Sequence, residues 1–173
     1  MKKLLLPFFF LGSIAMMVVM LKTSASLKTD ATPMGIIDLE FAYNTTKTSA
    51  IINAWAPTNE LDNISVAKVN TYWDFLFLFF YAGFLFMACK KIAANIKGPV
   101  AKAGNIIAKA ALLAGFLDVL ENAGMLLTLN NQGSSTVAFC TTFISIIKWG
   151  LALIAVLYVL TGLLVLTYRR IKY

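Results

Sequence analysis

Apolar residues fill four long stretches of the chain, and polar or basic segments separate them. The stretches cover residues 4–21, 71–89, 103–129 and 137–167. Each approaches or exceeds the roughly 20 apolar residues with which a helix crosses about 30 Å of hydrocarbon. Transmembrane barrel strands alternate apolar with polar residues, and these stretches do not. The pattern predicts an all-α fold, a single membrane domain with a bundle of four transmembrane helices. The predicted spans are residues 4–22, 71–90, 104–129 and 137–168.

The connection between the first two spans, residues 23–70, contains the only extended polar sequence and predicts a small extracytoplasmic cap. Within it, Asp38 and Glu40 alternate with apolar neighbours, as they would in a short strand. The same residues would equally suit the first turn of a helix, because periodicity over so few positions does not decide. Both interpretations place Asp38 and Glu40 in the cap.

Two helix starts are expected later in the cap. Thr45 or Thr46 is a suitable N-cap for a short helix that carries Trp55 on its apolar side. Thr58 is a second candidate N-cap, with Glu60 and Asp62 in the first turn, where acidic side chains favour the helix dipole. Since no helix breaker follows before residue 89, one long helix is expected to begin outside the membrane and run through it. The fourth span is also too long for a bilayer, so its outer turns are expected to lie beside the cap.

Composition supports a membrane location. The chain has 173 residues, of which 60% are hydrophobic and 13% charged, whereas soluble domains have about 25% charged residues. Its net charge of +7 comes from lysines and arginines at both termini and in the second connection, with no acid among them. Basic loops stay cytoplasmic, so we expect a bacterial plasma membrane protein with both termini inside. The lipid bilayer is the expected partner of these basic segments, and nucleic acid is not.

The absence of histidine and the scarcity of cysteine exclude several kinds of cofactor, metal and disulfide site. With no histidine, haem held by two histidines, histidine-ligated zinc and histidine proton relays are excluded. Cys89 and Cys140 are predicted at opposite ends of the bilayer, too far apart for a disulfide. No cofactor and no metal site are predicted.

The polar residues inside the predicted spans are the candidate site. Asp118, Glu121 and Asn122 are spaced to share one face of a helix. Counting about 1.5 Å per residue from the basic ends places Lys148 nearest in height to Asp74, with Glu121 within reach. Tyr81 shares the face of Asp74, and its hydroxyl is expected to complete the network. The Asp38–Glu40 segment is expected to form the roof of this site.

Two interpretations of this cluster stay open. The polar groups can be mutual structural contacts between helices, all satisfied and inert. Such contacts average only about 0.6 kcal/mol in one well-studied case, which is a weak reason to place several charges in lipid. Ionisable residues within a membrane otherwise indicate a functional site.

Four short segments occur in a distinctive order along the chain. They are residues 35–42 (GIIDLEFA), 51–55 (IINAW), 74–77 (DFLF) and 117–122 (LDVLEN). Together they resemble a family of small four-helix bacterial inner-membrane proteins. The resemblance implies the four-helix architecture and the membrane location, and it implies no particular activity.

Three functions fit the sequence. The first is a binding or transport-like protein whose pocket takes a small molecule or a lipid. The second is an accessory subunit whose apolar faces contact other membrane subunits or further copies of the chain. The third is a lipid-active enzyme that uses carboxyl groups as acid and base. The enzyme ranks last, because the sequence contains no histidine, metal motif or activated nucleophile.

Overall fold

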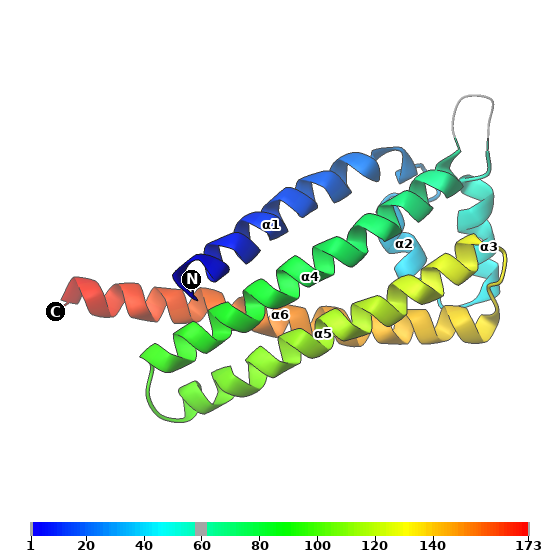
Figure 1. Cartoon of the computed structure of the whole chain (residues 1–173). Coiled ribbons are helices and arrows are strands. Elements are labelled where there is room, and N and C mark those ends of the chain that lie inside the picture. Colours follow the sequence, from blue (N-terminus) through cyan, green and yellow to red (C-terminus); the bar gives the residue numbers. More distant parts are fainter. Residues whose placement is uncertain (1, 58–61, 173) are drawn as a thin grey trace.

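The computed structural model describes residues 2–57 and 62–172, and within those ranges it contains helices and no β-strand (Figure 1). The elements are α1 (Lys2–Thr23), the 3₁₀ helix η1 (Ala25–Leu27), α2 (Ile36–Glu40), α3 (Thr45–Ala54), α4 (Asn63–Asn95), α5 (Pro99–Leu129) and α6 (Ser135–Lys172). Helices α1, α4, α5 and α6 are long and apolar enough to cross a membrane. The predicted all-helical chain with four such helices is therefore confirmed.

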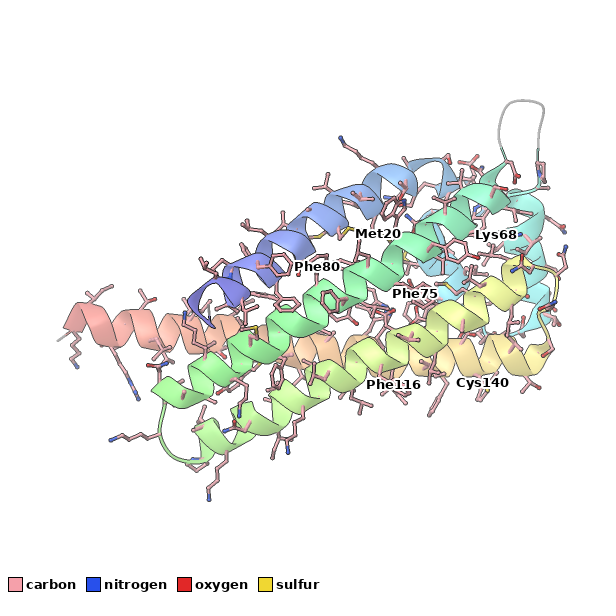
Figure 2. All side chains as sticks on the ribbon, in the orientation of Figure 1. Met20, Lys68, Phe75, Phe80, Phe116 and Cys140 are labelled. Atoms are coloured by element: carbon pink, nitrogen blue, oxygen red, sulfur yellow. The ribbon has the colours of Figure 1, made fainter. Side chains whose placement is uncertain are left out.

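Helix α4 is at the centre of the arrangement. It packs against α5, α1 and α6, while α5 and α6 pack against each other. The short elements η1, α2 and α3 gather at one end of the bundle, and we call them the cap. Both chain termini and the α4–α5 connection lie toward the opposite end (Figure 1). Large apolar side chains such as Phe116 point away from the bundle, as a lipid-facing surface requires (Figure 2).

Glycine allows α1 to approach α4 closely. A Cβ atom at Gly12 of α1 would collide with the ring of Phe80 on α4. In the reverse direction, a Cβ atom at Gly83 of α4 would collide with the ring of Phe9. Each helix thus receives an aromatic ring of its neighbour at a position without a side chain. Glycine residues at such positions let helix backbones approach closely in lipid, where the hydrophobic effect does not drive helices together.

Small residues also form the contact between α4 and α5. Ala111, Ala114 and Gly115 are buried along one face of α5, and a Cβ atom at Gly115 would lie 2.7 Å from the Cβ of Ala82 on α4. Asp118 is on the same face, one turn further along. The close packing therefore directs the carboxylate into the bundle rather than toward lipid.

The cap is a small folded unit attached to the bundle. The Trp55 side chain is fully buried, and its Nε1 donates to the carbonyl of Leu27 at 3.0 Å and to Oγ1 of Thr32 at 3.1 Å. Met125 and Leu129 of α5 belong to the same apolar cluster. The cap is thus held to the end of α5 by apolar packing.

Three local expectations need correction. Residues 36–40 form a helix, so the strand alternative is wrong. The N-cap of α3 is Asn44, whose Oδ1 accepts from the Lys47 amide at 2.9 Å, rather than either threonine. The N-cap of α4 is Asp62, which accepts from the Ser65 amide at 3.0 Å.

Asn and Asp are strong N-caps because a short side chain positions an acceptor for the free amides of the first turn. The hydroxyl of Ser65 also donates to Asp62, and this hydrogen bond lowers the pKa of that carboxyl group. Thr58 and Glu60, which were expected to begin this helix, lie outside the described residues.

Replacement of Gly115 by alanine tests the close approach of α4 and α5. The added methyl group must displace Ala82, which we expect to cost about 1–3 kcal/mol of unfolding free energy. Gly150 is the control, because a Cβ atom there meets no atom within 4 Å. Gly150→Ala should be neutral or stabilise α6 by up to about 1 kcal/mol. Unfolding in detergent followed by circular dichroism measures both, and equal stability of the two variants would contradict the packing.

Candidate functional site

Lys148 of α6 is the centre of a buried ion cluster. Its Nζ lies 2.8 Å from Oε1 of Glu121, 3.1 Å from Oδ1 of Asp118 and 3.6 Å from Oε2 of Glu40. All three carboxylates and the lysine are buried, and Glu121 has no exposed surface. Within the described residues, these contacts are the only ion pairs. The single buried ammonium thus joins α5, α6 and the cap.

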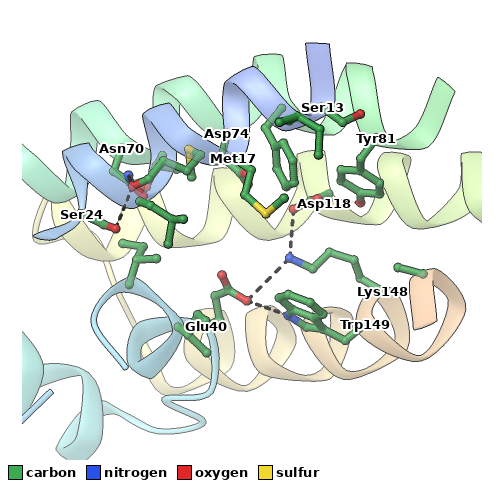
Figure 3. A pocket seen from close by; sticks show the side chains of 18 of the residues that line it. Ser13, Met17, Ser24, Glu40, Asn70, Asp74, Tyr81, Asp118, Lys148 and Trp149 are labelled. Atoms are coloured by element: carbon green, nitrogen blue, oxygen red, sulfur yellow. Dashed lines mark hydrogen bonds and ion pairs between the residues drawn. The ribbon is translucent and has the colours of Figure 1, made fainter. Parts of the chain in front are cut away.

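Glu40, the last residue of α2, enters the cluster from the cap. Its backbone carbonyl accepts from the hydroxyls of Thr142 at 3.0 Å and Ser145 at 3.3 Å, both on α6. Its carboxylate accepts from Nε1 of Trp149 at 2.9 Å. Figure 3 shows Lys148 and Trp149 directed from α6 toward this carboxylate. The cap is therefore docked on α6 through both the backbone and the side chain of one residue.

The other predicted polar residues form two further contacts. The hydroxyl of Tyr81 donates to Oδ2 of Asp118 at 2.7 Å. Nδ2 of Asn122 donates to Oδ2 of Asp74 at 2.8 Å. All six predicted network residues therefore come together, since Asp118 joins Tyr81 to Lys148 and Asn122 follows Glu121 on the same face of α5.

The predicted partners are met in part. Lys148 reaches Glu121 as expected, but Asp74, its predicted neighbour in height, is not among its ion-pair partners, which are on α5 and the cap. The Tyr81 hydroxyl joins the network as expected, through Asp118. Counting residues from the basic ends of the spans compares the heights of side chains along the membrane normal. It does not show which helices are neighbours. Because α6 packs extensively on α5 and less on α4, the lysine meets the carboxylates of α5.

The two other predicted cap residues lie away from the cluster. Asp38 is at the surface, where Oδ2 accepts from the amide of Met34 at 2.8 Å. Trp55 is in the core of the cap, as described above. Of the three predicted cap residues, only Glu40 reaches the buried charges.

Sequence reasoning found Lys148 but missed the other α6 residues of the site. Thr142, Ser145 and Lys148 recur every three residues, followed by Trp149, and this spacing marks a polar face on the first half of α6. The repeat was visible in the sequence and indicates the docking surface of Glu40. Asn70 was missed as well. It is fully buried on α4, and its Nδ2 donates to the carbonyl of Met20 and to Oγ1 of Thr23 on α1.

A cavity of about 510 Å³ adjoins the cluster. Its volume lies in the range of about 300–1,000 Å³ that is typical of small-molecule sites. The charged part of its lining consists of Lys28, Glu40, Asp74, Asp118 and Lys148. Tyr81, Asn70 and Trp149 contribute other polar atoms. The rest of the wall is mostly apolar, with residues from α1, α4 and α6 such as Ile14, Met17, Phe77, Phe84 and Val156.

The cavity is open to the surroundings of the bundle. Met17 on α1 and Trp149 on α6 both line it, yet they are 43% and 46% exposed. Figure 3 shows the side chains of these two residues facing the cavity from opposite sides. A molecule in the cavity would therefore contact the outside of the bundle between α1 and α6.

Hydrogen-bond acceptors are in excess around the cluster. Oε2 of Glu121, Oδ1 of Asn122 and Oδ1 of Asn70 are buried with no hydrogen-bond partner. A buried polar atom without a partner costs about 1–3 kcal/mol. Of these three residues only Asn70 lines the cavity, so its Oδ1 favours an occupant that can donate a hydrogen bond. In residues 2–57 and 62–172, no three cysteine or carboxylate side chains come together in an arrangement suited to a metal ion.

No family model, curated protein or solved structure matches the chain. The resemblance to a family of four-helix inner-membrane proteins therefore stays a prediction. Function has to be inferred from the geometry of the cluster and the cavity.

A double-mutant cycle tests the central ion pair. Lys148→Met leaves three buried carboxylates without a cation, and removal of one partner of a buried pair costs about 3–5 kcal/mol. Glu121→Gln removes one of those charges, so it should recover part of the loss in the double variant, with a coupling of about 1–3 kcal/mol. Denaturant unfolding in detergent gives these free energies.

Lys90→Met is the matched control for this cycle. Lys90 is exposed and hydrogen bonded only to Asn105 among the described contacts, so its replacement should change stability by no more than about 0.5 kcal/mol. Equal costs at the two lysines, or strictly additive effects of Lys148 and Glu121, would contradict the role of Lys148 as the centre of the cluster.

Proposed function

We propose that this protein binds a small amphipathic molecule, in a binding or transport-like role, at a site within the membrane. The observation that carries this proposal is the cavity of about 510 Å³, whose wall is apolar along α1, α4 and α6 and whose cap end is charged. Small-molecule sites are typically apolar with a few convergent polar groups that fix orientation. An apolar chain would lie along the wall, and a polar head would reach Asp74, Asp118 and Glu40.

A ligand of this kind would enter from the bilayer. The exposed lining residues Met17 and Trp149 are in helices that are long and apolar enough to span a membrane. The opening between α1 and α6 therefore faces acyl chains. Entry by this route keeps the apolar part of the molecule out of water throughout, which makes a lipid or a lipid-soluble molecule the natural occupant.

We further propose that the protein resides in a bacterial inner membrane with the cap outside and both termini in the cytoplasm. The support is the charge distribution. Lysines and arginines cluster at the termini and around the α4–α5 connection, and all of these lie toward the end of the bundle opposite the cap. Positive charges next to transmembrane helices are retained on the cytoplasmic side.

Ala152→Phe tests the binding role. Ala152 lines the cavity from α6, and a phenyl ring there would occupy the space of a ligand. Native mass spectrometry of the purified full-length protein should show a bound lipid or small molecule, and Ala152→Phe should lower its occupancy at least about tenfold, which corresponds to about 1.4 kcal/mol.

Leu153→Phe is the control, because residue 153 is adjacent on α6 and is 58% exposed without lining the cavity. Equal occupancy in Ala152→Phe and wild type would overturn the assignment of the cavity. Co-purification of a protein subunit, with no bound small molecule in wild type, would support the accessory-subunit role instead.

Cysteine labelling tests the orientation. In a Cys140→Ser background, Gln132→Cys places a thiol between α5 and α6 at the cap end, and Lys97→Cys places one between α4 and α5. A membrane-impermeant maleimide should label residue 132 in intact spheroplasts and residue 97 only after permeabilisation, because the basic connection stays inside. The reverse pattern would refute the proposed orientation.

A further inference from the structure

We infer that the polar head recognised in this cavity is an ammonium group, and that Asp74 is its main partner. The inference rests on the proposed function, because it specifies the chemistry of the amphipathic ligand. Its observations are the placement of Asp74, the partners of Lys148 and the buried Oδ1 of Asn70, which has no donor.

Asp74 is the carboxylate of the cavity that has no cation. Lys148 lies within ion-pair distance of Glu121, Asp118 and Glu40, but not of Asp74. The described hydrogen-bond partner of Asp74 is the amide of Asn122, which contacts only Oδ2. Lys28 lines the cavity from the cap and is beyond ion-pair distance of every carboxylate that the structure describes. Asp74 is thus an acceptor that faces a mostly apolar cavity, and no cation of the described residues forms an ion pair with it.

The α4 wall beside Asp74 offers a further acceptor and no free donor, because the donors of Asn70, Thr71 and Tyr81 are all used. Asn70 lies one turn before Asp74 on α4 and lines the same cavity. Both donated hydrogen bonds of Asn70 are used on α1, whereas its Oδ1 is buried without a partner. Phe77 lines the cavity one turn after Asp74, and an aromatic face attracts a cation. An ammonium group would supply the donors and the positive charge that this wall lacks.

An anionic head fits poorly. Lys28 lines the cavity but is exposed to solvent, which screens its charge. Lys148, the only buried lysine among the residues whose burial is described, is already shared among carboxylates at 2.8, 3.1 and 3.6 Å. A phosphate or carboxylate placed beside it would lie close to Asp118 and Glu40, and like charges at short range repel strongly where water is scarce. A neutral hydroxyl would satisfy an oxygen but leave the charge of Asp74 uncompensated.

The test compares probes of equal chain length on the full-length protein in detergent. Decylamine, decanol and decanoate are titrated at neutral pH, and binding is measured by native mass spectrometry. Charge-assisted hydrogen bonds are about twice as strong as neutral ones, so decylamine should bind at least about tenfold more tightly than decanol. Decanoate should bind most weakly.

Asp74→Asn should reduce the preference for decylamine over decanol to about threefold or less, and a circular dichroism spectrum like that of wild type shows that the variant is folded. Asp38→Asn is the matched control, because Asp38 does not line the cavity and its carboxylate accepts from the backbone amide of Met34. It should keep the full preference. An unchanged preference in Asp74→Asn would overturn the assignment of this carboxylate.

The outcomes separate the two proposals. If none of the three probes binds, the amphipathic binding role fails. If decanol or decanoate binds as tightly as decylamine in wild type, the ammonium inference fails while the binding role stands.

A final experiment compares decylamine binding in nanodiscs of phosphatidylethanolamine with decylamine binding in nanodiscs of phosphatidylglycerol. Competition with decylamine only in phosphatidylethanolamine identifies a membrane lipid as the source of the ammonium, and equal binding in both identifies a free amphipathic amine.

Discussion

The structure depends on the compensation of charge within an apolar bundle. Carboxylates and an ammonium group removed from water are stable only if they meet partners of opposite charge or hydrogen-bond donors. Lys148 is the buried group that can neutralise the carboxylates of Glu121, Asp118 and Glu40. This requirement fixes the rotation of α5 and α6 about their axes, and it brings α2 from the cap onto α6. The ion pairs of Lys148 therefore have two effects. They hold α5, α6 and the cap together, and they gather the charged side chains of the site in one place.

Packing by small residues leaves room beside this cluster. The backbones of α4 and α5 approach closely where Gly115 meets Ala82, which directs Asp118 inward. Helix α1 is attached to α4 through reciprocal contacts of glycine with phenylalanine and, near the cap, through Asn70. Because α1 packs along α4 and not along α6 to a comparable extent, the space between α1 and α6 remains as the cavity. A bundle with tighter α1–α6 packing would have buried Asp74 against protein instead of leaving it facing that space.

An incomplete set of partners distinguishes the cluster from a purely structural network. Where polar groups serve only to hold helices together, each donor and acceptor is expected to be satisfied. Here Lys148 and Trp149 are fully engaged, whereas Asp74 has one amide partner and several buried oxygens have none. The imbalance is all of one kind, acceptors without donors, and it occurs beside a cavity of ligand size.

The sequence by itself determined the four long apolar helices, the cap between the first two, and the identity of most residues in the polar cluster. These follow from hydropathy and helical periodicity, which depend on residues close together in the chain. Only the tertiary structure decided that Lys148 pairs with carboxylates of α5 and not with Asp74, that Glu40 rather than Asp38 reaches the cluster from the cap, and that a cavity lies between α1 and α6. Such contacts depend on which helices are neighbours and how each is rotated. Neighbours and rotation are set by packing between residues as far apart as Gly12 and Phe80 or Glu40 and Thr142, and no local pattern records them.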